Sequence, residues 1–342
     1  MSATGRRPLW PRSIVESYSF DKKVSTVNRR TFLATSAAVA LQQTTEAAAS
    51  MPIIDCHIHL FDVSRPQGVP WPPKNDPVLY KTASIERYRK IAVPLGIVGA
   101  IEVEASPWLE DNQWVLDIAA KDKILVGTVG DLEPDKPDFR QQLERFHKNP
   151  LFRGIRYGNL WDRDFTAAIG KTEFISGLKL LAQADLVMDT ANPDPKLIAD
   201  LVRLTDKVPS LRIVVDHLPR LVKPKESAAL KQYEANLRTL AARKQVYFKV
   251  SGVVRKVNGK AVEDPAFYTP FIDEMFDLFG EDRLIYGSDW PNSDTWAEYP
   301  VELKIVRAYF DAKGKAASEK YFWRNSVAAY KWIRRTENQP KA

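Results

Sequence analysis

The chain has 342 residues, of which 44% are hydrophobic and nine are tryptophan, enough for a substantial core. Its formal net charge is +7, but residues 1–49 hold seven Lys or Arg and three acids, so the remainder carries only +3 and does not favour nucleic-acid binding. One cysteine excludes an internal disulfide, and no run of 18 apolar residues predicts a transmembrane span or a stable membrane anchor.

Residues 1–50 have the pattern of an export leader. Asn28–Leu33 reads Asn-Arg-Arg-Thr-Phe-Leu, a twin-arginine motif, and a mildly apolar stretch and three alanines at 47–49 follow it. We therefore predict a bacterial twin-arginine-type signal region over 1–50, export to the periplasm, and one folded domain over 51–337. A disordered basic tail is the alternative interpretation of the leader.

From residue 53, short apolar strands alternate with amphipathic helical stretches. Strands are expected at 53–59, 98–105, 124–131, 152–158, 185–191, 211–217, 246–252 and 283–289. Helices are expected at 84–93, 111–121, 138–147, 172–184, 195–206, 226–243, 267–279, 299–312 and 315–335. Eight β-then-α units in one domain predict an α/β fold, the parallel (β/α)8 TIM barrel. The alternative, a doubly wound open sheet, would want a glycine-rich phosphate turn after the first strand, and none is present there.

The first strand carries the motif Asp55-Cys56-His57-Ile58-His59. Because side chains alternate faces along a strand, Asp55, His57 and His59 are expected on one face. Two neutral imidazoles on one face can bind a single metal ion. A buried histidine pair satisfied by the backbone and water is the alternative.

A TIM barrel has its active site at the C-terminal ends of its strands. Asp289 ends the eighth strand, which adjoins the first when the barrel closes, and His217 ends the sixth. A divalent ion held by His57, His59 and Asp289 would lower the pKa of a bound water. Asp289 is also the expected base, and His217 is placed to polarise a substrate carbonyl.

Substrate contacts are expected around the same rim. Arg156, at the end of the fourth strand, is the expected clamp for a carboxylate or carbonyl group, and Tyr157 beside it is a further expected substrate contact. Lys249 on the seventh strand either orients an anionic substrate or pairs with Glu104 or Asp289. Four tryptophans follow strand ends, where they could stack on a sugar or lactone ring or simply pack the rim: Trp71, Trp108, Trp161 and Trp290.

Five motifs follow one another along the chain. They are Ile54–His59, Phe152–Arg156, Val214–Leu218, Phe248–Gly252 and Leu284–Pro291. Together they resemble the amidohydrolase superfamily, and more narrowly the amidohydrolase-related branch that holds 2-pyrone-4,6-dicarboxylate lactonases and sugar-acid lactonases such as L-fuconolactonase. The resemblance spans residues 53–335.

The resemblance implies that His57, His59, His217 and Asp289 match the family's strand-one pair, strand-six histidine and strand-eight aspartate. Binuclear members add a strand-four lysine or glutamate and a strand-five histidine, which this chain lacks. One divalent ion, with zinc as the expected identity, is therefore favoured over two, and Glu104 and Asp189 are weaker candidate ligands. Some members of the branch work without metal, so a metal-free mechanism stays open.

We predict a hydrolase that opens a small-molecule lactone of a sugar acid or related carboxylate, with water activated by Asp289. Whether the chain is a monomer or a homo-oligomer is left open. A metal-dependent non-oxidative decarboxylase is the first alternative, disfavoured because such enzymes typically also use a histidine on the strand-five side. The second alternative, an exported non-catalytic carbohydrate-binding barrel, would be expected to have lost one of the four polar rim residues, and none is lost.

Overall fold

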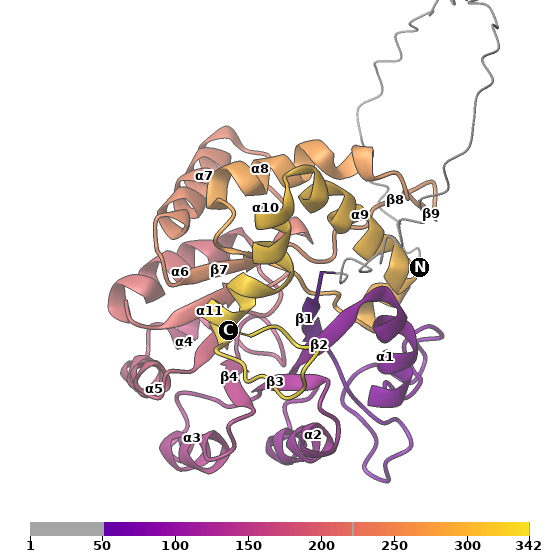
Figure 1. Cartoon of the computed structure of the whole chain (residues 1–342). Coiled ribbons are helices and arrows are strands. Elements are labelled where there is room, and N and C mark those ends of the chain that lie inside the picture. Colours follow the sequence, from indigo (N-terminus) through magenta and orange to yellow (C-terminus); the bar gives the residue numbers. More distant parts are fainter. Residues whose placement is uncertain (1–50, 221, 342) are drawn as a thin grey trace, which may run out of the picture. The chain divides into compact units, whose positions relative to one another are not determined.

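The computed structural model describes residues 51–220 and 222–341. They form the predicted (β/α)8 barrel, with eight parallel strands in the order β1-β2-β3-β4-β5-β6-β7-β10 and helices around them (Figure 1). The predicted signal region, residues 1–50, lies outside the described residues. None of the helices in the described part of the chain is long and apolar enough to cross a membrane.

The barrel strands match the eight that the sequence predicted. They are β1 (Ile53–Ile58), β2 (Ile97–Val103), β3 (Leu125–Gly130), β4 (Phe152–Arg156), β5 (Val187–Asp189), β6 (Arg212–Val215), β7 (Val246–Lys249) and β10 (Leu284–Ile285). The helices between and after them are α1 (Ile85–Ala92), α2 (Leu109–Lys121), α3 (Phe139–His147), α5 (Thr172–Gln183), α6 (Pro195–Lys207), α7 (Ser227–Ala241), α8 (Thr269–Phe279) and α9 (Tyr299–Ala312).

Some features were not predicted. A short helix, α4 (Phe165–Ala168), follows β4, and a hairpin of β8 (Lys256–Val257) and β9 (Lys260–Ala261) follows β7. The helix expected at 315–335 was wrong in part, because the chain forms α10 (Lys315–Glu319), a π-helical turn, and then α11 (Asn325–Tyr330). Lys331, in the left-handed conformation, ends α11.

Helix boundaries follow local sequence chemistry. The side chain of Asp194 accepts a hydrogen bond from the amide of Leu197 (2.7 Å), and Pro195 occupies the first turn of α6. The buried side of α6 includes Leu197, Ile198, Leu201 and Leu204. This spacing of three and four residues is what the sequence pattern predicted.

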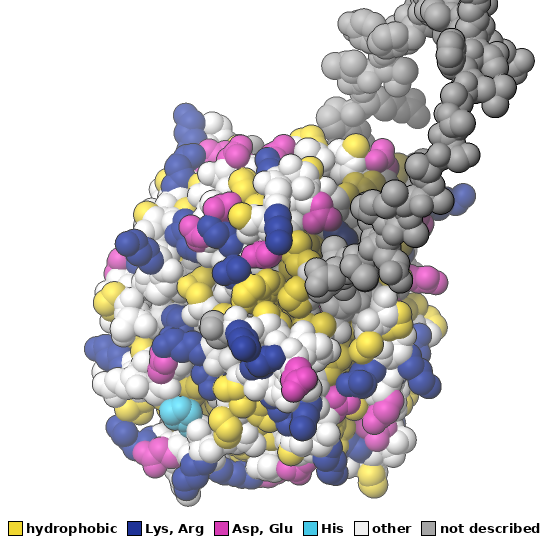
Figure 2. All heavy atoms as spheres, in the orientation of Figure 1, with side chains coloured by type: hydrophobic (Ala, Val, Ile, Leu, Met, Phe, Trp, Pro, Cys, Tyr) yellow, Lys and Arg dark blue, Asp and Glu magenta, His cyan; other side chains and the backbone are white. Residues whose placement is uncertain are grey.

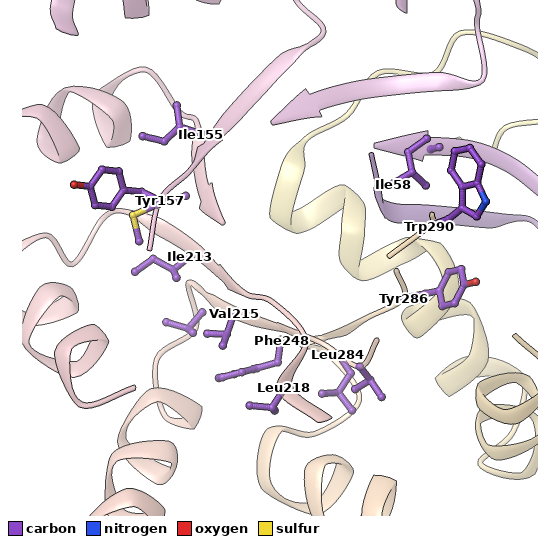
Figure 3. Packing of buried hydrophobic residues seen from close by; sticks show 14 of the residues in the cluster. Ile58, Ile155, Tyr157, Ile213, Val215, Leu218, Phe248, Leu284, Tyr286 and Trp290 are labelled. Atoms are coloured by element: carbon purple, nitrogen blue, oxygen red, sulfur yellow. The ribbon is translucent and has the colours of Figure 1, made fainter. Parts of the chain in front are cut away.

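Buried apolar side chains form one layer outside the barrel strands and one layer inside the barrel. The outer layer lies between strands and helices, and Figure 3 shows part of it, with Ile155, Ile213 and Phe248 from three different strands. The inner layer fills the barrel with side chains such as Ile54 and Val103. On the face that Figure 2 shows, basic and acidic side chains are interspersed.

The C-terminal segment closes the N-terminal end of the barrel. Trp323, Tyr330 and Trp332 belong to the inner layer. At the starts of β4 and β6, Arg153 and Arg212 each donate from Nε to backbone carbonyls at the end of α11, both at 2.9 Å. This packing leaves the opposite end of the barrel to carry the site.

The barrel closes along a seam, by which we mean the backbone contacts between residues 56–59 and 286–290. The amide of Asp289 donates to the carbonyl of His57 (2.8 Å), and the amide of His59 donates to the carbonyl of Trp290 (2.8 Å). Gly287 permits this approach, since a Cβ there would lie 2.8 Å from the Cβ of His57. The seam therefore sets the first and last strands side by side at the rim.

Substituting Gly287→Ala should lower the free energy of unfolding by about 1–3 kcal/mol, because the added methyl group has no room beside His57. Urea unfolding followed by circular dichroism measures the change. Wild-type stability in this variant would mean that the two strands are farther apart than the seam requires.

Candidate active site

Four side chains converge at the rim of the barrel. His57 and His59 come from the end of β1, His217 follows β6 and Asp289 follows β10. Asp289 Oδ1 lies 3.6 Å from His57 Nε2, 3.3 Å from His59 Nε2 and 3.5 Å from His217 Nε2. All four side chains are buried. The structure thus brings together the four residues that the sequence analysis placed at one rim.

The backbone of β1 does not alternate regularly through this motif. The pairing of β1 with β2 shifts register between Asp55 and Ile58. As a result Cys56 belongs to the inner layer, His57 also faces the barrel interior, and Asp55 points outward. The expectation that Asp55 shares a face with the two histidines was therefore wrong.

His217 and Asp289 occupy the left-handed region of backbone conformation, with φ of 48° and 58°. Non-glycine residues rarely adopt this conformation, and it is concentrated at functional sites. Here it turns each side chain toward the barrel axis directly after the strand ends. This strained backbone conformation directs the side chains of His217 and Asp289 toward each other.

Backbone and side-chain partners orient the imidazoles. His59 Nδ1 lies 2.7 Å from the carbonyl of Val103, which can only accept, so Nδ1 carries the proton and Nε2 offers its lone pair. His217 Nδ1 lies 2.8 Å from Ser251 Oγ. Burial, and next the Lys249 ammonium, hold the pKa of His57 well below its usual range, so this imidazole is neutral.

The spacing of these groups fits one divalent ion. The three ligand atoms of His57, His59 and Asp289 are separated by 3.2, 3.3 and 3.6 Å. A tetrahedral ion with bonds of about 2.0–2.1 Å places its ligands about 3.3–3.4 Å apart. Three protein ligands leave a fourth position open, as in catalytic rather than structural sites.

A pocket of about 260 Å³ opens at these groups. The chain segments after β1, β2, β4, β5, β6 and β10 supply its walls. The residues that line it are His59, Trp71, Glu104, Ala105, Arg156, Leu160, Trp161, Asn192, His217, Asp289 and Asn292. The volume suits a small ring compound.

Comparison with known proteins identifies the family of the chain. A family model of amidohydrolases matches residues 54–332. This protein belongs to the amidohydrolase family.

Relatives of this amidohydrolase include sugar lactonases. An L-fucono-1,5-lactonase from Burkholderia ambifaria is 27% identical over 242 residues, covering 70% of this chain and 80% of the relative. A solved amidohydrolase from Burkholderia multivorans with bound zinc has a TM-score of 0.71 at 22% identity, covering 82% of this chain and 99% of that one. A putative 2-pyrone-4,6-dicarboxylic acid hydrolase from Pseudomonas putida has a TM-score of 0.62 at 20% identity, covering 82% and 98%.

Of the predicted substrate contacts of the amidohydrolase, Trp71, Trp161 and Arg156 line the pocket. The ring of Trp71 lies edge-on to His59, with centroids 5.6 Å apart. Arg156 Nε donates to Asp216 Oδ2 (3.2 Å), and its Nη1 lies 3.7 Å from Glu104 Oε1. Arg156 is thus held in place before any substrate arrives.

Trp290 and Tyr157 do not line the pocket, so their predicted substrate contacts find no support in the structure. Trp290 is fully buried in the outer layer, beside Ile58 in Figure 3, and packs against Tyr88. Tyr157 packs on Phe174, with ring centroids 4.8 Å apart. Both follow strand ends, but their side chains turn outward to the helices.

Lys249 was predicted to orient an anionic substrate or to pair with Glu104 or Asp289, but its carboxylate partners in the structure are Asp189 and Asp216. It is fully buried, and its Nζ lies 2.6 Å from Asp189 Oδ2 and 2.9 Å from Asp216 Oδ1. Its Nζ also lies 3.0 Å from His57 Nδ1. Lys249 is therefore part of the floor beneath the pocket.

The weaker candidate ligands are also engaged elsewhere. Asp189 Oδ2 accepts from Lys249 and from the hydroxyl of Tyr330 (2.9 Å), and burial raises the pKa of Asp189 to about 6. Glu104 Oε2 accepts from Trp161 Nε1 (3.1 Å) and from the amide of Ser106 (3.0 Å), and burial raises the pKa of Glu104 to about 8. Neither carboxyl belongs to the ligand cluster.

A second possible ligand set, His57, Asp216 and His217, overlaps the first. Lys249 lies against two of its members, with its ammonium at hydrogen-bond distance from His57 Nδ1 and Asp216 Oδ1. A second cation would have to displace that ammonium. The residues around His57 therefore fit one ion and not two.

The sequence analysis overlooked some residues that complete the site. Asn292 Nδ2 donates to Asp289 Oδ2 (2.8 Å), and Asn192 lines the pocket. Asp216 anchors both Arg156 and Lys249. Asp216 was detectable, since it directly precedes His217 at a strand end, but Asn192 and Asn292 sit in loops whose course the sequence does not reveal.

With zinc as the probe, the purified protein should bind one ion per chain, and His59→Ala should weaken binding more than about 10-fold because it removes one of three ligands. Competition with a chromophoric chelator and elemental analysis measure affinity and stoichiometry. His147→Ala, an exposed histidine at the end of α3, is the matched control. Uptake of two ions, or unchanged affinity in His59→Ala, would contradict the assignment.

Proposed function

We propose that this amidohydrolase hydrolyses the cyclic ester of a sugar acid. The observation that carries the proposal is the convergence of three imidazoles on Asp289 at the base of a pocket walled by Trp71 and Trp161. A general base beside hydrogen-bond donors suits attack of water on a carbonyl, and indole rings suit the face of a sugar ring. The similarity to L-fucono-1,5-lactonases supports the same reaction.

In the proposed reaction, Asp289 takes a proton from a water molecule while the water oxygen bonds to the lactone carbonyl carbon. Asn292 holds Asp289 Oδ2, so Oδ1 faces the imidazoles. His217 donates a hydrogen bond to the carbonyl oxygen as negative charge develops there. The ring C–O bond then breaks, and the proton passes from Asp289 to the leaving alkoxide to give an open hydroxy acid.

We propose zinc as the ion for His57, His59 and Asp289, in keeping with the nitrogen and oxygen donors and with the zinc bound to the structural relative. When bound, a divalent ion would make the water more acidic and stabilise charge on the carbonyl oxygen. His57 would hold the ion through Nε2 if its Nδ1 proton pointed to Asp216 Oδ1, 3.5 Å away. If Lys249 donates to Nδ1 instead, His57 carries its proton on Nε2 and serves the metal-free mechanism as a donor.

The charges of the pocket favour an uncharged, hydroxylated ring. Among the described residues that line it, Arg156 is the one lysine or arginine, and it already faces Asp216 and Glu104. A substrate with free carboxylates would need unpaired cations in this buried setting. Asn192, Asn292 and Glu104 instead offer hydrogen-bonding groups that suit ring hydroxyls.

The decarboxylase alternative has less support. It was expected to require a histidine on the β5 side, where the structure has Asp189 held by Lys249 and Tyr330. The residues that face the pocket match the demands of ester hydrolysis more closely.

Asp289→Asn should lower kcat for lactone opening by about 10²–10⁴-fold, because an amide cannot accept the proton of water. A pH indicator follows proton release from a panel of sugar-acid lactones. Asp138→Asn, which alters an exposed acid before α3, should leave the rate unchanged. A rate near that of the wild type in Asp289→Asn would rule out the proposed base, and no hydrolysis of any lactone by the wild type would favour the non-catalytic alternative.

Trp161→Ala should raise KM by about 3–10-fold with little change in kcat, because it removes one stacking wall of the pocket. Trp108→Ala is the matched control, since Trp108 is 37% exposed and does not line the pocket. Equal KM values for the two variants would show that Trp161 does not contact the substrate.

A further inference from the structure

Asp55 presents an unusual buried carboxylate outside the pocket. It is fully buried, and it points outward from β1 toward the helices α1 and α9. Its oxygens accept hydrogen bonds from two backbone amides and two tyrosine hydroxyls. Nothing in the proposed reaction uses this group directly.

The two amides belong to the two sides of the seam. Asp55 Oδ1 accepts from the amide of His57 (3.2 Å) and from the amide of Ser288 (2.8 Å). His57 is a candidate metal ligand, and Ser288 immediately precedes Asp289. One carboxylate oxygen thus joins the backbone that carries the imidazole to the backbone that carries the base.

The seam needs such a bridge because its strand pairing is short. β10 contains only two residues, and β1 is irregular between Asp55 and Ile58. The carboxylate supplies an acceptor for amides that a regular ladder would otherwise satisfy. Asp55 Oδ1 thus adds a side-chain link to the direct hydrogen bond from the amide of Asp289 to the carbonyl of His57.

Two tyrosines fix the other oxygen. Tyr88 in α1 and Tyr299 in α9 each donate a hydroxyl to Asp55 Oδ2 at 2.9 Å. Tyr286 in turn lies 3.3 Å, oxygen to oxygen, from the hydroxyl of Tyr299. The helices around the barrel therefore hold Oδ2, whereas the two backbone amides of the seam hold Oδ1.

We propose that Asp55 is a positioning residue that sets the distance between His57 and Asp289 through their backbones, and so controls turnover without touching the substrate. The turnover part of this inference rests on the proposed function. The bridge requires an acceptor oxygen at one place, so the oxygen of asparagine can replace it. Valine, which is slightly smaller and has no acceptor, cannot accept hydrogen bonds from the two amides.

The experiment compares Asp55→Val, Asp55→Asn and the double variant Tyr88→Phe with Tyr299→Phe. Asp55→Val should lower kcat about tenfold or more with KM within about twofold of wild type, and should weaken zinc binding about tenfold. Asp55→Asn should keep both values within about threefold. The double tyrosine variant should lose thermal stability but keep kcat and zinc affinity within about threefold, since it leaves Oδ1 in place.

A kcat and zinc affinity in Asp55→Val within about twofold of wild type would overturn the proposal. So would equal losses in Asp55→Val and in the double tyrosine variant at equal loss of melting temperature. If Asp55→Val does not fold, Asp55→Glu takes its place: it keeps the charge but moves the oxygens, and must lose more kcat than Asp55→Asn. If the wild type opens no lactone, the proposed function fails, while the zinc affinities still test the bridge.

Discussion

The hydrogen bonds across the seam are the constraint on which the site of this amidohydrolase depends. They join the backbones of His59 and Trp290, from opposite ends of the barrel sequence, and they place His57 and Asp289 on adjoining strands. The candidate ligand set is therefore complete only where the last strand packs against the first.

Beneath the pocket, the protein maintains a set of buried charges. Lys249 contacts Asp189 and Asp216, and Arg156 also contacts Asp216. Removing such groups from water is costly, and well-packed apolar residues often serve stability as well or better. These charges act instead on His57. The Lys249 ammonium helps to keep the imidazole neutral, and Asp216 and Lys249 together orient it.

The fold and the four rim groups were predictable from sequence because both rest on regular features. The alternation of strands and helices identified the barrel, and the positions of His217 and Asp289 at strand ends placed them at one rim. Asp55 was assigned to the wrong face because a register shift breaks the alternation on which that prediction relied. Trp290 and Tyr157 were expected at the pocket because they follow strands, but the apolar space beneath the helices holds them.

The residues at the base of the pocket and those in its walls come from different kinds of chain segment. Strand ends and the seam fix the floor, whereas the walls come from connecting segments, including the long loop that carries Trp71. In those segments Trp161 and Asn192 have positive φ values of 57° and 45°. This backbone conformation is uncommon for residues other than glycine, and it sets the direction of both side chains. Attack of water on a carbonyl carbon requires only the four rim residues, His57, His59, His217 and Asp289. In the proposed function, the choice of ring falls to two indoles, two amides and Arg156, which is already paired with Asp216, and these groups suit hydroxyl groups better than free carboxylates.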